Sequence, residues 1–185
     1  MTELRWLEPG ESDAVLAAAH LFDHPPTREW TKDFLSRAGH HLCVAYVDGQ
    51  AAGFVTGVEM VHPDKGLEMF LYELGVDEAF RGRGVGRALV TALAQRAREA
   101  GCYGMWVLTD PENDAGRRTY ESAGATGRGP QLMLDWRFDA SSGPAVSTTR
   151  SGQEPDSVGE ARDRDTDQAE RAADVGERDG RLVEQ

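Results

Sequence analysis

A glycine-rich run joins a short apolar segment to a helical repeat, and this junction constrains the fold more than any other feature of the chain. Residues Met69–Val76 are apolar and aromatic and end at a charge, which predicts a buried strand. From Val85 to Leu93 apolar residues recur at helical spacing. The run between them, Arg81 to Arg87, reads RGRGVGR. A glycine-rich turn that opens a helix leaves backbone N–H groups unpaired, and these groups, the helix dipole and the arginines together suit a phosphate or pyrophosphate.

The spacing of this run excludes two common phosphate loops. A Walker loop ends in Gly-Lys-Ser/Thr, where this chain has Arg87-Ala88. The dinucleotide fingerprint requires G-x-G-x-x-G, with an acidic residue after a second strand, and the run RGRGVGR does not have that glycine spacing. What remains is Arg-x-x-Gly-x-Gly after a strand that ends in Leu74-Gly75-Val76, and this resembles the acetyl-CoA pyrophosphate loop of the GNAT N-acetyltransferases. The alternative is that the glycines only make a tight strand-to-helix turn.

A second segment supports the resemblance. Asn113 is followed by Tyr120 and Gly124 in NDAGRRTYESAGA, the order in which GNAT enzymes carry Asn and then Tyr-x-x-x-Gly. Gly116 stands in place of the usual alanine and Ala125 in place of the usual aromatic residue. Two motifs in the expected order indicate a GNAT-superfamily N-acetyltransferase.

The resemblance implies an α/β fold of the GNAT type. Its mixed central sheet of about six to seven strands is splayed between the Met69–Val76 strand and the next one, and helices flank both faces. The residue pattern predicts strands at Leu4–Leu7, Tyr103–Leu108 and Gln131–Phe138. It predicts a hairpin in which Asp48-Gly49 joins the strands Leu42–Val47 and Ala51–Val61. The predicted helices run from Ser12 to Phe22, from Thr27 to Arg37, from Val85 onward and over Glu112–Ala123.

Composition sets the remaining bounds. With 32 acidic and 20 basic residues the net charge is −12, which disfavours nucleic acid as a partner. The first residues lack a secretory core and no apolar run approaches membrane-spanning length, so a cytoplasmic protein without a membrane partner is expected. Cys43 and Cys102 have no metal or disulfide spacing, and no metal is predicted. We expect residues 1–138 to form the acetyltransferase domain and residues 139–185, acidic and free of aromatic residues, to be a disordered tail.

The resemblance also implies roles for residues at the cofactor site, with acetyl-CoA as the cofactor. Backbone groups of the strand end would pair with the pantetheine arm, the N–H of Val76 or its neighbour would polarise the thioester carbonyl, and the loop would hold the pyrophosphate. Asn113 would bind pantetheine, and Tyr120 would protonate the departing thiolate. The alternatives are a helix cap for Asn113 and a packed helix residue for Tyr120. The expected cofactor-binding residues are Leu74, Gly75, Val76, Arg81, Gly82, Arg83, Gly84, Val85, Gly86, Arg87, Asn113 and Tyr120.

A charge inside the apolar strand predicts the acceptor side. Glu73 is costly to bury without a partner or a task, and we hypothesise that it orders the attacking ammonium and accepts its proton. Its alternative role is a salt bridge to an arginine. Strand alternation places Glu73 with Leu71 and Gly75, opposite Phe70, Tyr72 and Leu74, unless a bulge rotates the register. Tyr72 is the second candidate for a catalytic residue on this wall.

The substrate follows from a narrower resemblance, to the aminoglycoside (gentamicin) 3-N-acetyltransferases of the GNAT type. Glu68, Tyr72 and Glu73 match their acidic-x-x-x-Tyr-acidic strand, whereas their DDPA-like run is replaced by Glu112-Asn113-Asp114. The resemblance implies acetylation at the 3-N position of 2-deoxystreptamine, and hence antibiotic resistance. A polycationic amine suits a cleft of carboxylates, and the candidates are Asp23, Glu59, Asp64, Glu68, Glu73, Asp110 and Glu112.

Two other functions stay open at this point. The same chemistry could act on another amine, such as a polyamine, an amino-acid-like metabolite or a protein N-terminus. A catalytically silent CoA-binding module is the third possibility. Many relatives pair through the last strand, so a homodimer is also possible.

Overall fold

The computed structural model describes residues 1–127 and residue 129. The strand predicted at Gln131–Phe138 and the predicted acidic tail lie outside the described residues.

A five-stranded mixed sheet forms the centre of the described chain. Its strands lie side by side in sequence order, β1 to β5. The first four are antiparallel to their neighbours, and β5 runs parallel to β4. The predicted fold class, an α/β fold with a mixed central sheet, is therefore confirmed. The strands are β1 (Thr2–Trp6), β2 (His40–Val47), β3 (Gln50–His62), β4 (Gly66–Val76) and β5 (Met105–Trp106).

The turns and helix ends follow local chemistry in most places. Asp48 and Gly49, with φ of 50° and 78°, turn β2 into β3 as predicted. Thr27 caps α2 (Arg28–Ser36) by accepting the Trp30 N–H at 3.2 Å, also as predicted. The predicted cap at Ser12 is wrong: Ser12 is the buried first residue of α1 (Ser12–Ala17), after Glu11.

The remaining helices differ from prediction in length rather than place. The first predicted helix does not continue to Phe22, because α1 gives way after Ala17 to the short 3₁₀ helix η1 (Ala19–Leu21). The others are η2 (Glu78–Phe80), α3 (Val85–Glu99) and α4 (Asp114–Ser122). Within the described residues, no helix has both the length and the apolar character that crossing a membrane requires.

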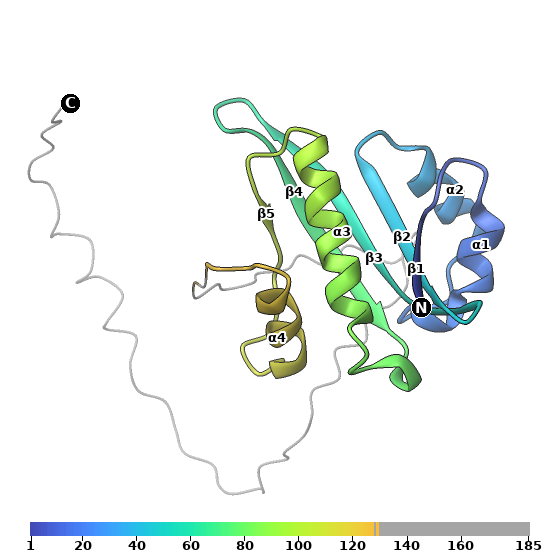
Figure 1. Ribbon diagram of the computed structural model, residues 1–185. Helices are drawn as coiled ribbons and strands as arrows, with labels where there is room; N and C mark the ends of the chain where they lie inside the picture. Colours follow the sequence, from blue (N-terminus) through green and yellow to red (C-terminus); the bar gives the residue numbers. More distant parts are fainter. Residues whose placement is uncertain (128, 130–185) are drawn as a thin grey trace, which may run out of the picture. The chain divides into compact units, whose positions relative to one another are not determined.

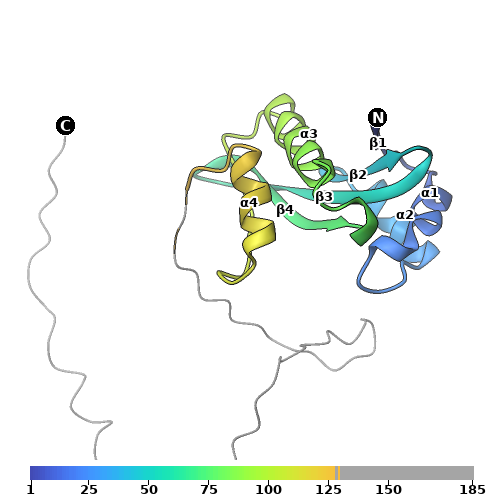
Figure 2. The ribbon, with the colours of Figure 1, turned by 60° about the horizontal axis from the view of Figure 1, so that its bottom comes forward.

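Each face of the sheet buries its own apolar core. On one face α3 inserts Leu89 and Leu93 against strand residues such as Val55. On the other, α1 and α2 pack Val15 and Leu35 against the sheet. Figure 1 follows the strands in order, and Figure 2 shows α3 on one side of the sheet and α1 and α2 on the other.

Candidate active site

A β-bulge in β4 sets the direction of the predicted acceptor residues. On β3 the neighbours Thr56 and Gly57 pair with Glu73 and Leu71, so Tyr72 is the extra residue of β4. A bulge of this kind leaves two consecutive residues opposite one partner and reverses the alternation beyond it. The simple alternation expected from the sequence is therefore wrong across this point, and the bulge considered as its exception is present.

The contacts around the bulge show which face each side chain occupies. Leu71 lies in the core beneath α3, and Leu74 packs against the same core. Tyr72 lies on the opposite face, where its ring meets that of Phe70 at 5.7 Å. Gly75 also faces that side, since a methyl group placed on it would lie 2.5 Å from Phe54 Cε1. Between these two positions, Glu73 shares the face away from α3, which we call the acceptor face.

The sheet opens between β4 and β5 directly beyond this point. Only Met69 and Phe70 of β4 pair with β5, so β4 beyond Phe70 has no described strand partner on that side. The Asp77 N–H bonds the Ala52 carbonyl on β3 at 3.0 Å. Because backbone groups alternate sides along a strand, those of Leu74 and Val76 point into the opening. Within the described residues, the predicted splay is thus visible next to Glu73 as N–H groups of Leu74 and Val76 without a strand partner, whereas the Val76 carbonyl accepts a hydrogen bond from Arg81 Nε.

The glycine-rich loop presents a row of free donors at the start of α3. Within the described chain, the six consecutive backbone N–H groups from Gly82 to Arg87 have no hydrogen-bond acceptor. Gly82 and Gly84 adopt φ of 73° and 82°, which L-residues with side chains rarely adopt, and Gly84 caps the helix. Arg81 Nε bonds the Val76 carbonyl at 3.2 Å, which ties the loop to the strand end. Free donors at a helix N-terminus fit a pyrophosphate.

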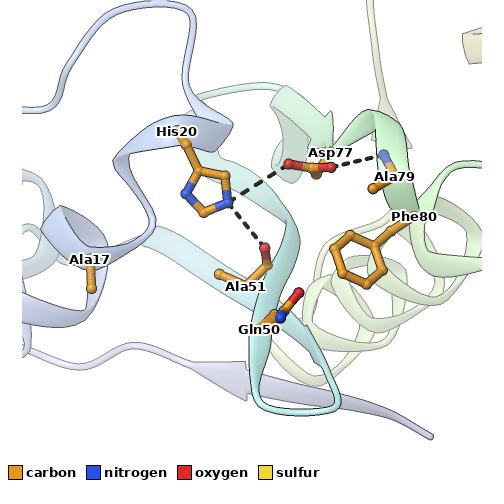
Figure 3. Close-up of a pocket in the computed structure, with 7 residues that line it drawn as sticks. All are labelled: Ala17, His20, Gln50, Ala51, Asp77, Ala79 and Phe80. Atoms are coloured by element: carbon orange, nitrogen blue, oxygen red, sulfur yellow. Dashed lines mark hydrogen bonds and ion pairs between the residues drawn. The ribbon is translucent and has the colours of Figure 1, made fainter.

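Contacts of Asp77 and His20 stabilise the segment that leads into the glycine-rich loop, and they were not predicted from the sequence. Asp77 accepts the Ala79 N–H at 2.8 Å and so caps η2. His20 Nε2 lies 3.9 Å from Asp77 Oδ2 and 3.2 Å from the Ala51 carbonyl oxygen. These groups border a depression of about 400 Å³ that Phe80 and Gln50 also line (Figure 3). These contacts link η1 to the strand that leads into the loop.

Helix α4 brings Tyr120 to the α3 side of the opening. Gly86 allows the close approach, because a methyl group on it would lie 3.1 Å from Thr119 of α4. Tyr120 is half-buried against the core that includes Val76, and this burial raises the pKa of its phenol. The phenol therefore keeps its proton at neutral pH.

Asn113 occupies the predicted place but uses its side chain within the helix start. Its Oδ1 accepts the Gly116 N–H at 2.9 Å, and its Nδ2 donates to Thr109 Oγ1 at 3.2 Å. A methyl group at Gly116 would lie 2.6 Å from Asn113 Nδ2, so the unusual glycine makes room for this cap. The cap is confirmed, and a contact to pantetheine stays a prediction.

On the acceptor face, Glu73 is a half-buried carboxylate without a neutralising partner. It makes no hydrogen bond or ion pair with any other described residue. Burial raises its pKa, the charge of Asp23 raises it further, and His24 lowers it. The loop that carries Asp23 is held near by Phe22, whose ring stacks on Phe54 at 4.0 Å. The alternative role considered for Glu73, a salt bridge to an arginine, is therefore not seen in the described chain.

The structure gathers only part of the predicted carboxylate set. Glu68 precedes the bulge on the same face as Phe70, and its Oε2 accepts the Tyr103 hydroxyl at 2.7 Å. Glu59 is paired with His41 at 2.7 Å, on the face that α3 covers. Asp110 accepts the N–H of Glu112 and shapes the turn before α4.

Asp64 pairs with His62 in the hairpin between β3 and β4. Within the described residues, no group of three or more His, Cys, Asp or Glu side chains is arranged to hold a metal ion.

Comparison with known proteins agrees with this architecture. A 2,4-diaminobutyric acid acetyltransferase of Nocardia farcinica is 34% identical over 111 residues, 60% of this chain and 54% of that protein. A mycothiol acetyltransferase of Thermomonospora curvata is 31% identical over 66% of this chain and 43% of its own length. A soil metagenomic aminoglycoside acetyltransferase in complex with sisomicin superposes with a TM-score of 0.68 at 18% identity, covering 74% of this chain and 96% of that one. The matched chain thus spans about half the length of these two sequence relatives.

A family model covers nearly all of the described residues. The model of the acetyltransferase (GNAT) family matches residues 2–125, which include the sheet, the loop and α4. The chain therefore belongs to the acetyltransferase (GNAT) family, whose acyl donor is acetyl-CoA.

Proposed function

We propose that the chain transfers the acetyl group of acetyl-CoA directly to a primary amine of an aminoglycoside in a ternary complex. The observation that carries this proposal is the opening beside β4. It has the free N–H row and Tyr120 on the α3 side, and the unpaired Glu73 on the acceptor face. Donor and acceptor can therefore approach from opposite faces of one sheet and meet at a single gap.

On the donor side, the backbone does the binding. The N–H groups from Gly82 to Arg87 would hold the pyrophosphate, and the helix dipole of α3 favours its negative charge. The exposed backbone of Leu74 and Val76 would pair with the pantetheine arm as an added strand does. The Val76 N–H is aimed into the opening, where it would polarise the thioester carbonyl. Acetyl-CoA, when bound, supplies the activated acetyl group.

On the acceptor face, Glu73 would orient the ammonium and take its proton. A carboxylate with a raised pKa is a better base than an exposed one, because its affinity for a proton lies closer to the working pH. The proton moves from the ammonium nitrogen to a carboxylate oxygen, directly or through one water, and the freed lone pair attacks the carbonyl. When the carbon–sulfur bond of the tetrahedral intermediate breaks, Tyr120, protonated at neutral pH, would donate its proton to the departing thiolate. The second proton that the amine loses would restore the phenol, directly or through water.

The charges on the acceptor face favour a polycationic acceptor. Among the described residues, the charged groups that act on Glu73 are Asp23 and His24, and neither is an arginine or a lysine. An amine-rich sugar suits such a surface better than an amino acid, whose carboxylate would need a cation. Tyr72, 66% exposed, offers its ring to the apolar side of a sugar. We place the target amine at the 3-N position of 2-deoxystreptamine, on the resemblance of Glu68, Tyr72 and Glu73, with resistance as the consequence.

Diaminobutyrate is the second candidate, supported by the Nocardia relative at 34% identity. The two are distinguished by following thiol release from acetyl-CoA with gentamicin, neamine, 2,4-diaminobutyrate, spermidine or no amine. We expect turnover with the aminoglycosides at the lowest KM, with the site of acetylation read by NMR. Turnover with diaminobutyrate alone would overturn the aminoglycoside assignment, and no turnover with any amine would contradict the enzyme itself.

A further inference from the structure

One buried hydroxyl on the acceptor face has no hydrogen-bond partner. Thr56 is 4% exposed, and its Oγ1 meets no donor or acceptor in the described chain. A buried polar group left in this state destabilises a fold, by about 1–3 kcal/mol in typical proteins. Valine has nearly the same shape and would avoid this cost. The hydroxyl therefore calls for an explanation beyond packing.

The position of Thr56 supplies that explanation. It is the cross-strand partner of Glu73, at the one residue of β3 that faces the bulge. Its neighbour Phe54 lies in the core on the side of α1 and α2, so alternation places Thr56 on the acceptor face as well. Side chains directly opposite on antiparallel strands stand about 4.5–5.5 Å apart at Cβ, close enough to contact each other.

We infer that Thr56 is a positioning residue for Glu73: its hydroxyl donates a hydrogen bond to the carboxylate and aims it at the acceptor amine. This inference rests on the proposed function only for the identity of the amine. Thr56 itself neither gains nor loses a proton. The proton passes from the ammonium to Glu73 while the hydroxyl holds the orientation of the accepting oxygen.

The ionisation of Glu73 provides a readout that packing alone would not move. Among the described residues, the charged groups that act on Glu73 are Asp23 and His24 in the loop after η1, and Tyr72 is its neighbour on β4. A donor to the ionised carboxylate lowers its pKa and so opposes the effect of burial and of Asp23. Removing that donor should therefore raise the pKa of Glu73.

The test is a carbon-13 NMR titration of the Glu73 carboxyl group in the full chain, assigned with Glu73→Gln. We expect Thr56→Val to raise its pKa by about one unit, the size of one lost hydrogen bond to a charge. Thr56→Ser should leave the pKa as it is. Thr56→Ala is a second variant without the hydroxyl. Thr91→Val, on the exposed surface of α3, makes the same threonine-to-valine change away from Glu73 and should leave the pKa of Glu73 unchanged. An unchanged pKa of Glu73 in both hydroxyl-free variants overturns the inference.

Kinetics give a second, independent comparison. In Thr56→Val the acid limb of the kcat/KM profile should move up by about one pH unit, because the carboxylate has lost its donor. A wild-type profile in that variant would mean that the hydroxyl only fills space. If the wild-type chain acetylates no amine, the proposed function fails, but the NMR titration still decides the role of Thr56.

Discussion

Replacing Gly84 by alanine should weaken CoA binding through backbone conformation alone. Gly84 has a φ of 82°, and nothing lies within 4 Å of the position that a methyl group would take. The substitution therefore creates no clash, but an L-residue in this region costs about 1–2 kcal/mol. The chain can relieve that strain by rotating the peptide, which turns the donor row of Gly82 to Arg87 away from its ligand.

The magnitude follows from the number of donors lost. One hydrogen bond from a backbone N–H to a charged phosphate oxygen contributes about 1.5–3 kcal/mol, so losing one should raise the Kd for CoA about 10- to 100-fold. Isothermal titration calorimetry with CoA measures this directly, and the double variant Gly82→Ala/Gly84→Ala should lose more than either single change.

Gly66 provides a matched control. It has a φ of 86°, also has nothing within 4 Å of a methyl position, and begins β4 in the hairpin far along the strand from the loop. Gly66→Ala should lower the thermal midpoint about as much as Gly84→Ala while leaving the Kd for CoA unchanged. Equal affinity in the wild-type and Gly84→Ala chains, or an equal loss in Gly66→Ala, would refute the reasoning.

Three further predictions concern single residues. Glu73→Gln should abolish the acid limb of the rate profile. It should also raise the thermal midpoint at neutral pH but not at acid pH. The pKa of Glu73 in the folded chain is raised above its ordinary value, so the wild-type chain loses stability as pH rises from the unfolded pKa through the folded one. Tyr120→Phe should lower kcat by about 100-fold at unchanged KM for acetyl-CoA in steady-state thiol release; an unchanged kcat would leave Tyr120 a packing residue. Gly75→Ala should destabilise the chain by about 1–3 kcal/mol in thermal unfolding, because its methyl group would lie 2.5 Å from Phe54 and 2.9 Å from the Leu21 carbonyl oxygen; a midpoint equal to that of Gly104→Ala, which has open space, would contradict this.

Features encoded within a few neighbouring residues could be predicted from the sequence. The hairpin turn at Asp48-Gly49 and the cap at Thr27 depend on local backbone chemistry, and both are where the pattern placed them. The donor loop belongs to the same class, because the glycines and the start of α3 are adjacent in the chain. The predicted cap at Ser12 is wrong because the helix starts one residue earlier than expected, with Glu11 at the N-cap position.

Features that depend on register could not be predicted. A bulge adds one residue to one strand without a compositional signal, so alternation alone placed Tyr72 and Glu73 on opposite faces. Thr56 could be identified as a candidate residue only once the strand register had placed it opposite Glu73. Glu59 was expected at the acceptor side, but its partner is His41 on the neighbouring strand, 18 residues away in sequence. The sequence therefore predicted more carboxylates at the acceptor side than the structure places there.

The measurement that tests the central claim most directly is a nitrogen-15 NMR titration of the backbone amides with CoA and, separately, with pantetheine, which lacks the pyrophosphate. The six N–H groups from Gly82 to Arg87 should shift with CoA and stay in place with pantetheine, while Leu74 and Val76 respond to both. Amide shifts confined to other parts of the chain, or equal responses of the loop to both ligands, would contradict a pyrophosphate site at the start of α3.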